Sequence, residues 1–250
     1  MSSQVGFDPR AAAIESIGSE PALPERALLF SSLAQIFGQS QANPQFPDWT
    51  PEMVQDRRRP VRVFTPETAV RASVLITLVG EAVPSVVLTQ RTQRLSDHAG
   101  QVSFPGGRAE PSDASEAMTA LREAREEIGL DPQLVSVWGR LPDYLTATGY
   151  RVAPVVGWVP RPNPFVIDPS EVEELFHVPL TYLMNPAHHQ VRIVEPHESP
   201  TGERIRFYAM PYVSPEHDGR EFFIWGATAA MLRNLYHFLS AGWQQQRDRG

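Results

Sequence analysis

The sequence predicts an α/β fold preceded by an N-terminal extension, and three observations lead to this expectation. The chain has 250 residues, of which 42% are hydrophobic and 20% charged, and these are ordinary values for a globular protein. From about residue 61, short apolar runs alternate with helical patterns, which is typical of an α/β domain. Prolines punctuate the first part of the chain at Pro21, Pro24, Pro44, Pro47, Pro51 and Pro60. We therefore expect an extension over residues 1–60 and the main domain over residues 61–245.

Apolar residues at helical spacing over Glu25–Phe37 predict that the extension is partly helical. We expect it to pack on the main domain or on a partner subunit, so a homodimer is one of the expected assemblies. In the main domain, apolar runs bounded by turn residues predict several strands. The predicted strands are Ala72–Leu78, Ser85–Leu88, Leu134–Leu141 and Val152–Val159, the loop is Arg91–Gly107, the helix is Asp113–Ile128, and Phe222–Leu239 is a strand end that turns into a C-terminal helix.

The composition limits the classes of function. There is no cysteine, which excludes a disulfide framework, a cysteine nucleophile and a cysteine-ligated zinc site. A net charge of −7 argues against binding to a nucleic-acid backbone. The first ten residues carry no basic start followed by an apolar run, and no apolar run is long enough to cross a membrane. We expect a cytoplasmic protein with neither nucleic-acid nor membrane partners.

The segment from Asp113 to Ile128 has the marks of an amphipathic helix. Asp113 and Glu116 have the spacing of a capping box, and Gly129 is placed to end the helix. At 100° per residue, one face is apolar and is expected to be buried. That face consists of Ala117, Ala120, Leu121, Ala124 and Ile128.

A neighbouring face of the same helix gathers Glu123, Glu126 and Glu127. Like charges three and four residues apart destabilise a helix, and acids near its C-terminus oppose the helix dipole. A hard divalent cation with oxygen ligands would remove this conflict. The alternative is a solvated acidic face that Arg122 and Arg125 partly neutralise, and the helix alone does not separate the two interpretations.

The residues before the helix favour the metal site, because together they resemble the Nudix box. Gly107 is followed after five residues by Asp113, and REAREEIGL then occupies residues 122–130. Asp113 stands where the family has glutamate, and eight residues rather than seven precede Arg122. Asp113 therefore either serves as the acid of the box or only caps the helix. The resemblance implies a Nudix α/β/α sandwich with a mixed β-sheet, in which Arg122 orients glutamates that bind Mg²⁺ or Mn²⁺. These glutamates would be Glu123, Glu126 and Glu127.

A second motif, LTQRTQRLSDHAGQVSFPGG over Leu88–Gly107, resembles the motif of the coenzyme A pyrophosphatase subgroup. The match includes Leu88, Thr89, Arg91, Gly100 and the four residues Phe104, Pro105, Gly106 and Gly107, whereas Thr92 and Ser96 depart from it. The resemblance implies hydrolysis of the pyrophosphate of coenzyme A or its thioesters to 3′,5′-ADP and 4′-phosphopantetheine. Gly106 and Gly107 would let the backbone approach the metal or the substrate, because glycine has no Cβ. Arg91 or Arg94 could hold a phosphate.

Acidic residues outside the box and two alternative functions also have to be considered. Glu171, Glu173 and Glu174 together have the pattern of a solvated helix start. Glu171 is also the candidate base or extra ligand outside the box, because it lies in a segment that is similar to the subgroup. None of the seven histidines lies in a metal-binding pattern. A Nudix hydrolase for another nucleoside diphosphate conjugate, such as a nucleotide sugar or a dinucleotide, is the nearest rival. A catalytically inactive module that binds coenzyme A or nucleotides is the other, and retention of the three box glutamates argues against it.

Overall fold

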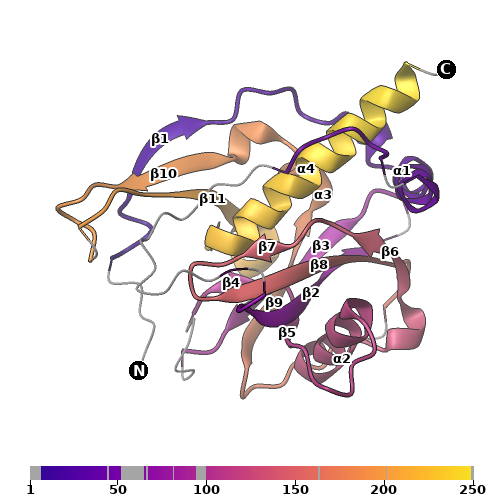
Figure 1. Ribbon diagram of the computed structural model, residues 1–250, viewed down its shortest axis with the longest axis horizontal. Coiled ribbons are helices and arrows are strands. Elements are labelled where there is room, and N and C mark those ends of the chain that lie inside the picture. The colour runs from indigo at the N-terminus through magenta and orange to yellow at the C-terminus, as the bar shows by residue number, and fades with distance from the viewer. Residues whose placement is uncertain are drawn as a thin grey trace.

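The computed structural model describes residues 7–43, 45–51, 65, 67–80, 82–93, 100–162, 164–200 and 202–248. It contains a large mixed sheet covered by helix α2 (Glu116–Ile128) on one face and by helix α4 (Gly226–Arg247) on the other, with a second sheet beyond α4 (Figure 1). The expected α/β/α sandwich with a mixed sheet is confirmed.

The large sheet has the order β4-β3-β2-β8-β6, with β5 paired to β2, β7 to β8 and β9 to β3. Its only parallel pair among the described residues is β2 with β8, and the other pairs are antiparallel. The strands are β2 (Val70–Val79), β3 (Ser85–Arg91), β4 (Val102–Ser103), β5 (Gly106–Arg108), β6 (Ser136–Arg140), β7 (Tyr144–Leu145), β8 (Tyr150–Val159) and β9 (Val172–Pro179).

The second sheet has the order β1-β10-β11-β12 and is antiparallel throughout. Its strands are β1 (Ala13–Ile17), β10 (Gln190–Val194), β11 (Ile205–Ser214) and β12 (Arg220–Trp225). The remaining helices are α1 (Phe30–Ala42) and α3 (Leu180–Leu183), with 3-10 turns at Glu25–Ala27, Pro132–Leu134, Pro186–His188 and Pro215–His217.

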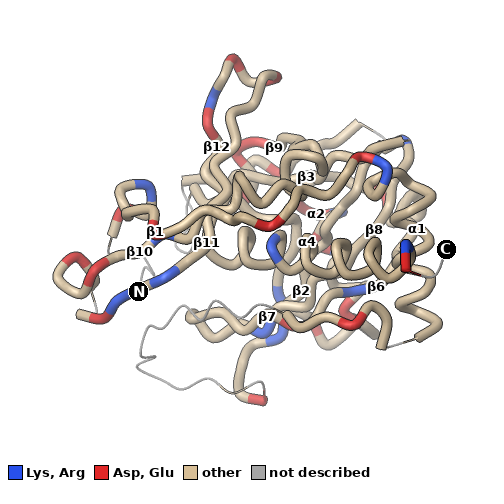
Figure 2. Tube along the Cα trace, turned by 90° about the horizontal axis from the view of Figure 1, so that it is seen from above, with Lys and Arg blue, Asp and Glu red and all other residues tan. Residues whose placement is uncertain are grey.

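Alternation along the strands divides the buried side chains between the two faces of the large sheet. Leu75 packs with Ala124 and Ile128 of α2 on one face. Ile76 belongs to the larger core on the other face, which includes α4, a helix with few charged residues (Figure 2). Burial of its apolar face on the large sheet therefore fixes the position of α2, as the sequence predicts. None of the described helices is long and apolar enough to cross a membrane.

Several sequence expectations need correction. Residues 173 and 174 belong to strand β9, not to a solvated helix start. The segment from Arg91 to Gly107, expected as a loop, contains the short strand β4 and the start of β5. Helix α2 begins later than expected, because Ser115 is its N-cap and accepts a hydrogen bond from Met118 N, so Asp113 is not the cap. The predicted C-cap is confirmed, since Gly129 adopts a left-handed conformation with φ 65°.

The N-terminal segment is built into the core. The helix expected over Glu25–Phe37 is divided into a 3-10 turn and α1, and α1 buries Leu33, Ile36 and Phe37 in the same cluster as α4. Strand β1 adds to the edge of the second sheet. Residues 52–64 lie outside the described residues, so the division of the chain at residue 60 stays a prediction.

A buried polar cluster joins the N-terminal segment to α4. Arg233, whose side chain is 7% exposed, forms an ion pair with Glu20. His189 is buried, and its Nε2 lies 2.7 Å from the carbonyl oxygen of Leu183. This nitrogen must therefore carry the proton, so Nδ1 accepts a hydrogen bond from Arg233 at 3.2 Å. Burial is the main cause that lowers the pKa of His189 to about 4.

His189 should make the stability of the protein depend on pH. Because its pKa is about 4 when folded and 6.5 as the ordinary value, the unfolded chain binds more protons between these values. The free energy of unfolding should then fall as the pH falls from 6.5 to 4, by about 3 kcal/mol from this residue. His189→Gln keeps an N–H donor but cannot titrate. In urea denaturation, the difference in the free energy of unfolding between wild type and variant should change across this pH window and stay constant above it. A difference that is constant throughout would contradict the assignment.

Candidate active site

Glu127 is the most deeply buried of the acids on α2. Its side chain is 3% exposed, its Oε2 accepts a hydrogen bond from Gly106 N at 3.2 Å, and its Oε1 lies 3.4 Å from Arg91 NH1. Burial raises the pKa of Glu127 to about 8, although Arg91 and the Gly106 N–H act in the opposite direction. Arg91 and the Gly106 N–H therefore do not fully compensate for the burial of the charged carboxylate.

Glu123 lies beside it against the glycine turn. Its side chain is 15% exposed, and burial is the main cause that raises its pKa. A Cβ on Gly107 would be 2.6 Å from Cδ of Glu123, and a Cβ on Gly106 would be 2.4 Å from the carbonyl oxygen of Ser73. Glycine is needed at position 106, where a Cβ would meet the backbone of β2, whereas at position 107 a Cβ would meet the end of the flexible Glu123 side chain. The glycine turn thus lies against Glu123, and the approach of this backbone to a metal or substrate stays a prediction.

Glu126 has a different environment, because its side chain is 58% exposed and lies 2.9 Å from Arg122 NH1. The same nitrogen is 3.0 Å from Glu123 Oε1. Among the described residues, no three acidic or histidine side chains already converge in a geometry that could hold a metal ion. Arg122 therefore holds two of the acids, while the third is buried next to Arg91.

Arg91 and Glu171 meet at the ends of β3 and β9. Arg91 NH2 lies 4.0 Å from Glu171 Oε2, so Arg91 stands between Glu171 and Glu127. The negative charge of Glu171 contributes to raising the pKa of both Glu123 and Glu127. Glu171 thus joins the same electrostatic group, and its side chain is 47% exposed. The other candidate arginine, at position 94, lies outside the described residues.

Asp113 has a role that its position as a predicted cap did not reveal. Its two oxygens accept hydrogen bonds from Arg122 at 3.2 and 3.0 Å, and Oδ2 also accepts from Thr119 Oγ1 and Glu110 N. The hydrogen bonds from Arg122 are the main cause that lowers the pKa of Asp113 to about 2. Arg122 NH2 also donates to the carbonyl oxygen of Arg108 at 2.9 Å. The guanidinium is therefore fixed on one side by Asp113 and on the other side holds the glutamates.

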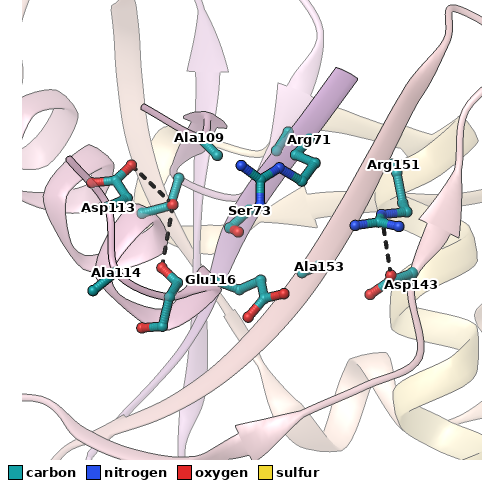
Figure 3. Close-up of a pocket in the computed structure, with 12 residues that line it drawn as sticks. Arg71, Ser73, Ala109, Asp113, Ala114, Glu116, Asp143, Arg151 and Ala153 are labelled. Atoms are coloured by element: carbon teal, nitrogen blue, oxygen red, sulfur yellow. Dashed lines mark hydrogen bonds and ion pairs between the residues drawn. The ribbon is translucent and has the colours of Figure 1, made fainter. Parts of the chain in front are cut away.

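A pocket lies beside the first turn of α2, at the other end of the helix from Glu127. It is bordered by Asp113 and by side chains from β2 and β8, among them Arg71, Ser73 and Arg151 (Figure 3). Arg151 is 3.5 Å from Asp143. Acidic and basic groups both line this pocket, and it is separate from the carboxylates of the site.

Helix α2 thus carries three acids beside a glycine turn and two arginines, and comparison with known proteins assigns the chain that has this arrangement to a family. The family model for the NUDIX domain matches residues 68–212, so the chain belongs to the Nudix family. As a Nudix hydrolase it acts on the pyrophosphate bond of a nucleoside diphosphate-linked substrate. Hydrolases of this family generally use divalent metals such as Mg²⁺.

Individual relatives are similar over much of the chain. The uncharacterized Nudix hydrolases NudL of Yersinia pestis (strain Pestoides F) and of Yersinia pseudotuberculosis (serotype O:1b) are each 39% identical over 166 residues, which cover 66% of this chain and 77% of the relative. Among solved structures, the Nudix hydrolase RenU of M. smegmatis has a TM-score of 0.39 at 21% identity, covering 45% of this chain and 71% of that chain.

Gly107→Ala should separate the position of Glu123 from the stability of the fold. The new Cβ would displace a carboxylate at the end of a flexible side chain, so we expect little loss of stability but a fall in kcat of roughly tenfold or more. The control is Gly38→Ala, because nothing lies within 4 Å of a Cβ at this position in α1. The control should leave kcat unchanged and raise the melting temperature slightly, since alanine favours a helix. Equal kcat for both variants and wild type would show that the packing of Glu123 on Gly107 is irrelevant to turnover.

Proposed function

We propose that the chain hydrolyses the pyrophosphate of coenzyme A or its thioesters and releases 3′,5′-ADP and 4′-phosphopantetheine. The observation that carries the proposal is the position of the motif Leu88–Gly107, which resembles the coenzyme A pyrophosphatase subgroup. Two parts of this motif border the buried carboxylates, because Arg91 lies 3.4 Å from Glu127 and Gly107 packs on Glu123. The motif that points to coenzyme A therefore also lines the site.

In this proposal Glu123, Glu126 and Glu127 would hold Mg²⁺ or Mn²⁺. The fit rests on donor chemistry, since Mg²⁺ prefers oxygen ligands and burial raises the pKa of two of these carboxyl groups. A bound cation would offset the cost of burying their charge. When bound, the ion would polarise the phosphoryl oxygens and make water a better nucleophile. Glu126 would have to turn from Arg122 toward its neighbours for all three to bind one ion.

The protein groups around the carboxylates have separate tasks in this reaction. The Gly106 N–H and Arg122 hold the glutamates in place through the hydrogen bonds and ion pairs described above. Arg91, or Arg94, would bind the diphosphate. Glu171 would accept a proton from the attacking water. The water oxygen forms a bond to phosphorus as the bridging P–O bond breaks, and the leaving phosphate keeps the electron pair of that bond.

The serine at position 96 favours a second class of substrate. Ser96 replaces an arginine of the coenzyme A motif, so one expected cation for a phosphate is missing. A nucleotide sugar or a dinucleotide, which has no 3′-phosphate, is the alternative substrate class. A cytoplasmic location and a homodimer are further parts of the proposal, and an inactive binding module is disfavoured because all three glutamates of the box are present.

Glu127→Gln tests the metal site. The change keeps the shape of the side chain and removes its charge, so kcat should fall on the order of 10²-fold or more if the metal supplies several kcal/mol of transition-state stabilisation. The melting temperature without metal should stay the same or rise, because a buried carboxylate is removed. Chelation should abolish wild-type activity, and added Mg²⁺ should restore it. The matched control is Glu116→Gln in the first turn of the same helix, which should turn over normally. Normal turnover of Glu127→Gln would contradict the assignment of Glu127 as a metal ligand.

Arg91→Ala tests which phosphate this residue serves. Because Arg91 lies between Glu127 and Glu171, we expect it to serve the scissile diphosphate. Its loss should lower kcat/KM for coenzyme A and for 3′-dephospho-coenzyme A by the same factor, roughly ten- to a hundredfold. A loss confined to coenzyme A would place Arg91 on the 3′-phosphate instead. Product masses from a panel that includes ADP-ribose and NADH decide the substrate, and cleavage of these without coenzyme A would overturn the proposal.

A further inference from the structure

Strands β3 and β9 are irregular where they reach the site. Their ladder is regular as far as the pair Gln90 and Glu174, but Arg91 then pairs with Val172, so the register shifts between Gln90 and Arg91. Such a bulge bends a strand and redirects a side chain, and bulges are common beside active sites. Here the irregular end of the ladder carries Arg91 on one strand and leads to Glu171 on the other. The direction of both side chains therefore depends on how this end of the ladder is held.

Arg220, from β12 of the second sheet, binds across the last regular pair before the bulge. Its NH2 donates to Gln90 Oε1 at 2.7 Å, and its NH1 donates to Glu174 Oε2. The guanidinium also lies 5.0 Å from the ring centroid of Phe222, which stacks on Phe176 of β9 at 3.7 Å. The planar fork of arginine suits such a two-point contact, and the aromatic ring below restricts its orientation.

A chain of hydrogen bonds continues from this contact to the backbone of the site. Gln90 Nε2 donates to the carbonyl oxygen of Gly100 at 3.3 Å, and Gly100 N donates to the carbonyl oxygen of Arg91 at 3.1 Å. On the other side of Arg91, Thr92 N donates to the carbonyl oxygen of Glu171 at 3.0 Å. Arg220 is thus connected to the main chain of both residues that we place around the diphosphate.

We infer that Arg220 is a positioning residue for hydrolysis: it fixes the bulged ends of β3 and β9 so that Arg91 and Glu171 face Glu127. This inference rests on the roles of these residues in the proposed function. Gln90 and Arg91 are consecutive in a strand, so their side chains point to opposite faces of the sheet. Arg220 therefore acts through the backbone and does not itself meet the reacting groups.

A positioning role for Arg220 predicts a change in local geometry without a change in global stability. The side chain of Arg220 is 46% exposed, and surface ion pairs contribute little to global stability. Loss of Arg220 should accordingly leave the melting temperature almost unchanged while it alters the local geometry. Arg206 offers a matched control, because it lies in the same sheet, is 52% exposed and forms an ion pair with Glu15 at 2.7 Å.

The experiment compares Arg220→Gln with Arg206→Gln by hydrogen exchange and by turnover of coenzyme A. In Arg220→Gln, the amides of Arg91, Thr92 and Gly100 should exchange roughly tenfold faster, while those of β8 should not change. Its kcat should fall roughly ten- to a hundredfold with KM within about twofold, because misplaced groups impair the chemical step. Arg206→Gln should match wild type in both measurements.

A double variant completes the test. If Arg220 acts through Arg91, the substitution Arg220→Gln should lower kcat much less in the Arg91→Ala variant than in the wild-type protein. Unchanged exchange, unchanged kcat or full multiplication of the two effects would each overturn the positioning role. Absence of coenzyme A hydrolysis in wild type would overturn the proposed substrate alone, since the exchange measurement does not depend on the substrate and would still decide the positioning.

Discussion

The burial of one carboxylate, that of Glu127, is the constraint on which the organisation of the site depends. A charged group taken out of water costs free energy unless hydrogen bonds and opposite charge replace the lost hydration. The protein supplies one backbone N–H, from Gly106, and one arginine, at 3.4 Å, and the pKa of Glu127 nevertheless rises to about 8. In the proposed function, a cation bound at this end of α2 would compensate for this remaining deficit. The neighbouring groups, including Glu123 and Glu171, increase that deficit because they add negative charge.

The framework around this carboxylate is rigid for separable physical reasons. Arg122 is held by Asp113, whose side chain is 5% exposed, so the guanidinium cannot follow the glutamates if they move. At Gly106 the backbone of β2 lies too close to admit a Cβ, and this contact fixes the path of the chain there. The helix itself is fixed by burial of its apolar face on the large sheet. Packing sets the position of the helix, and hydrogen bonds then set the directions of its polar side chains.

Sequence patterns predicted those parts of the protein that local periodicity determines. Helix α2, its glycine cap and the strands β2, β3, β6 and β8 follow from apolar spacing, which responds to burial alone. The Asp113–Arg122 pair and the Gln90–Arg220 contact could not be predicted, since both join residues whose proximity depends on tertiary packing. Strand β9 is not predicted, because the consecutive acids Glu173 and Glu174, exposed and half-buried, hide the alternation that its buried residues follow. The metal-binding, base and phosphate-binding roles of the site residues stay predictions.

The pairing of β1 with β10 has a consequence for the order in which the molecule is assembled. Ala13 is paired with Ile193, which lies 180 residues further along the chain and is therefore synthesised much later. Contacts between such distant segments form slowly, because the intervening chain must close a long loop. Strand β1 therefore has no pairing partner until the chain has been made as far as β10. Addition of β1 to the edge of the second sheet should therefore be a late step in folding.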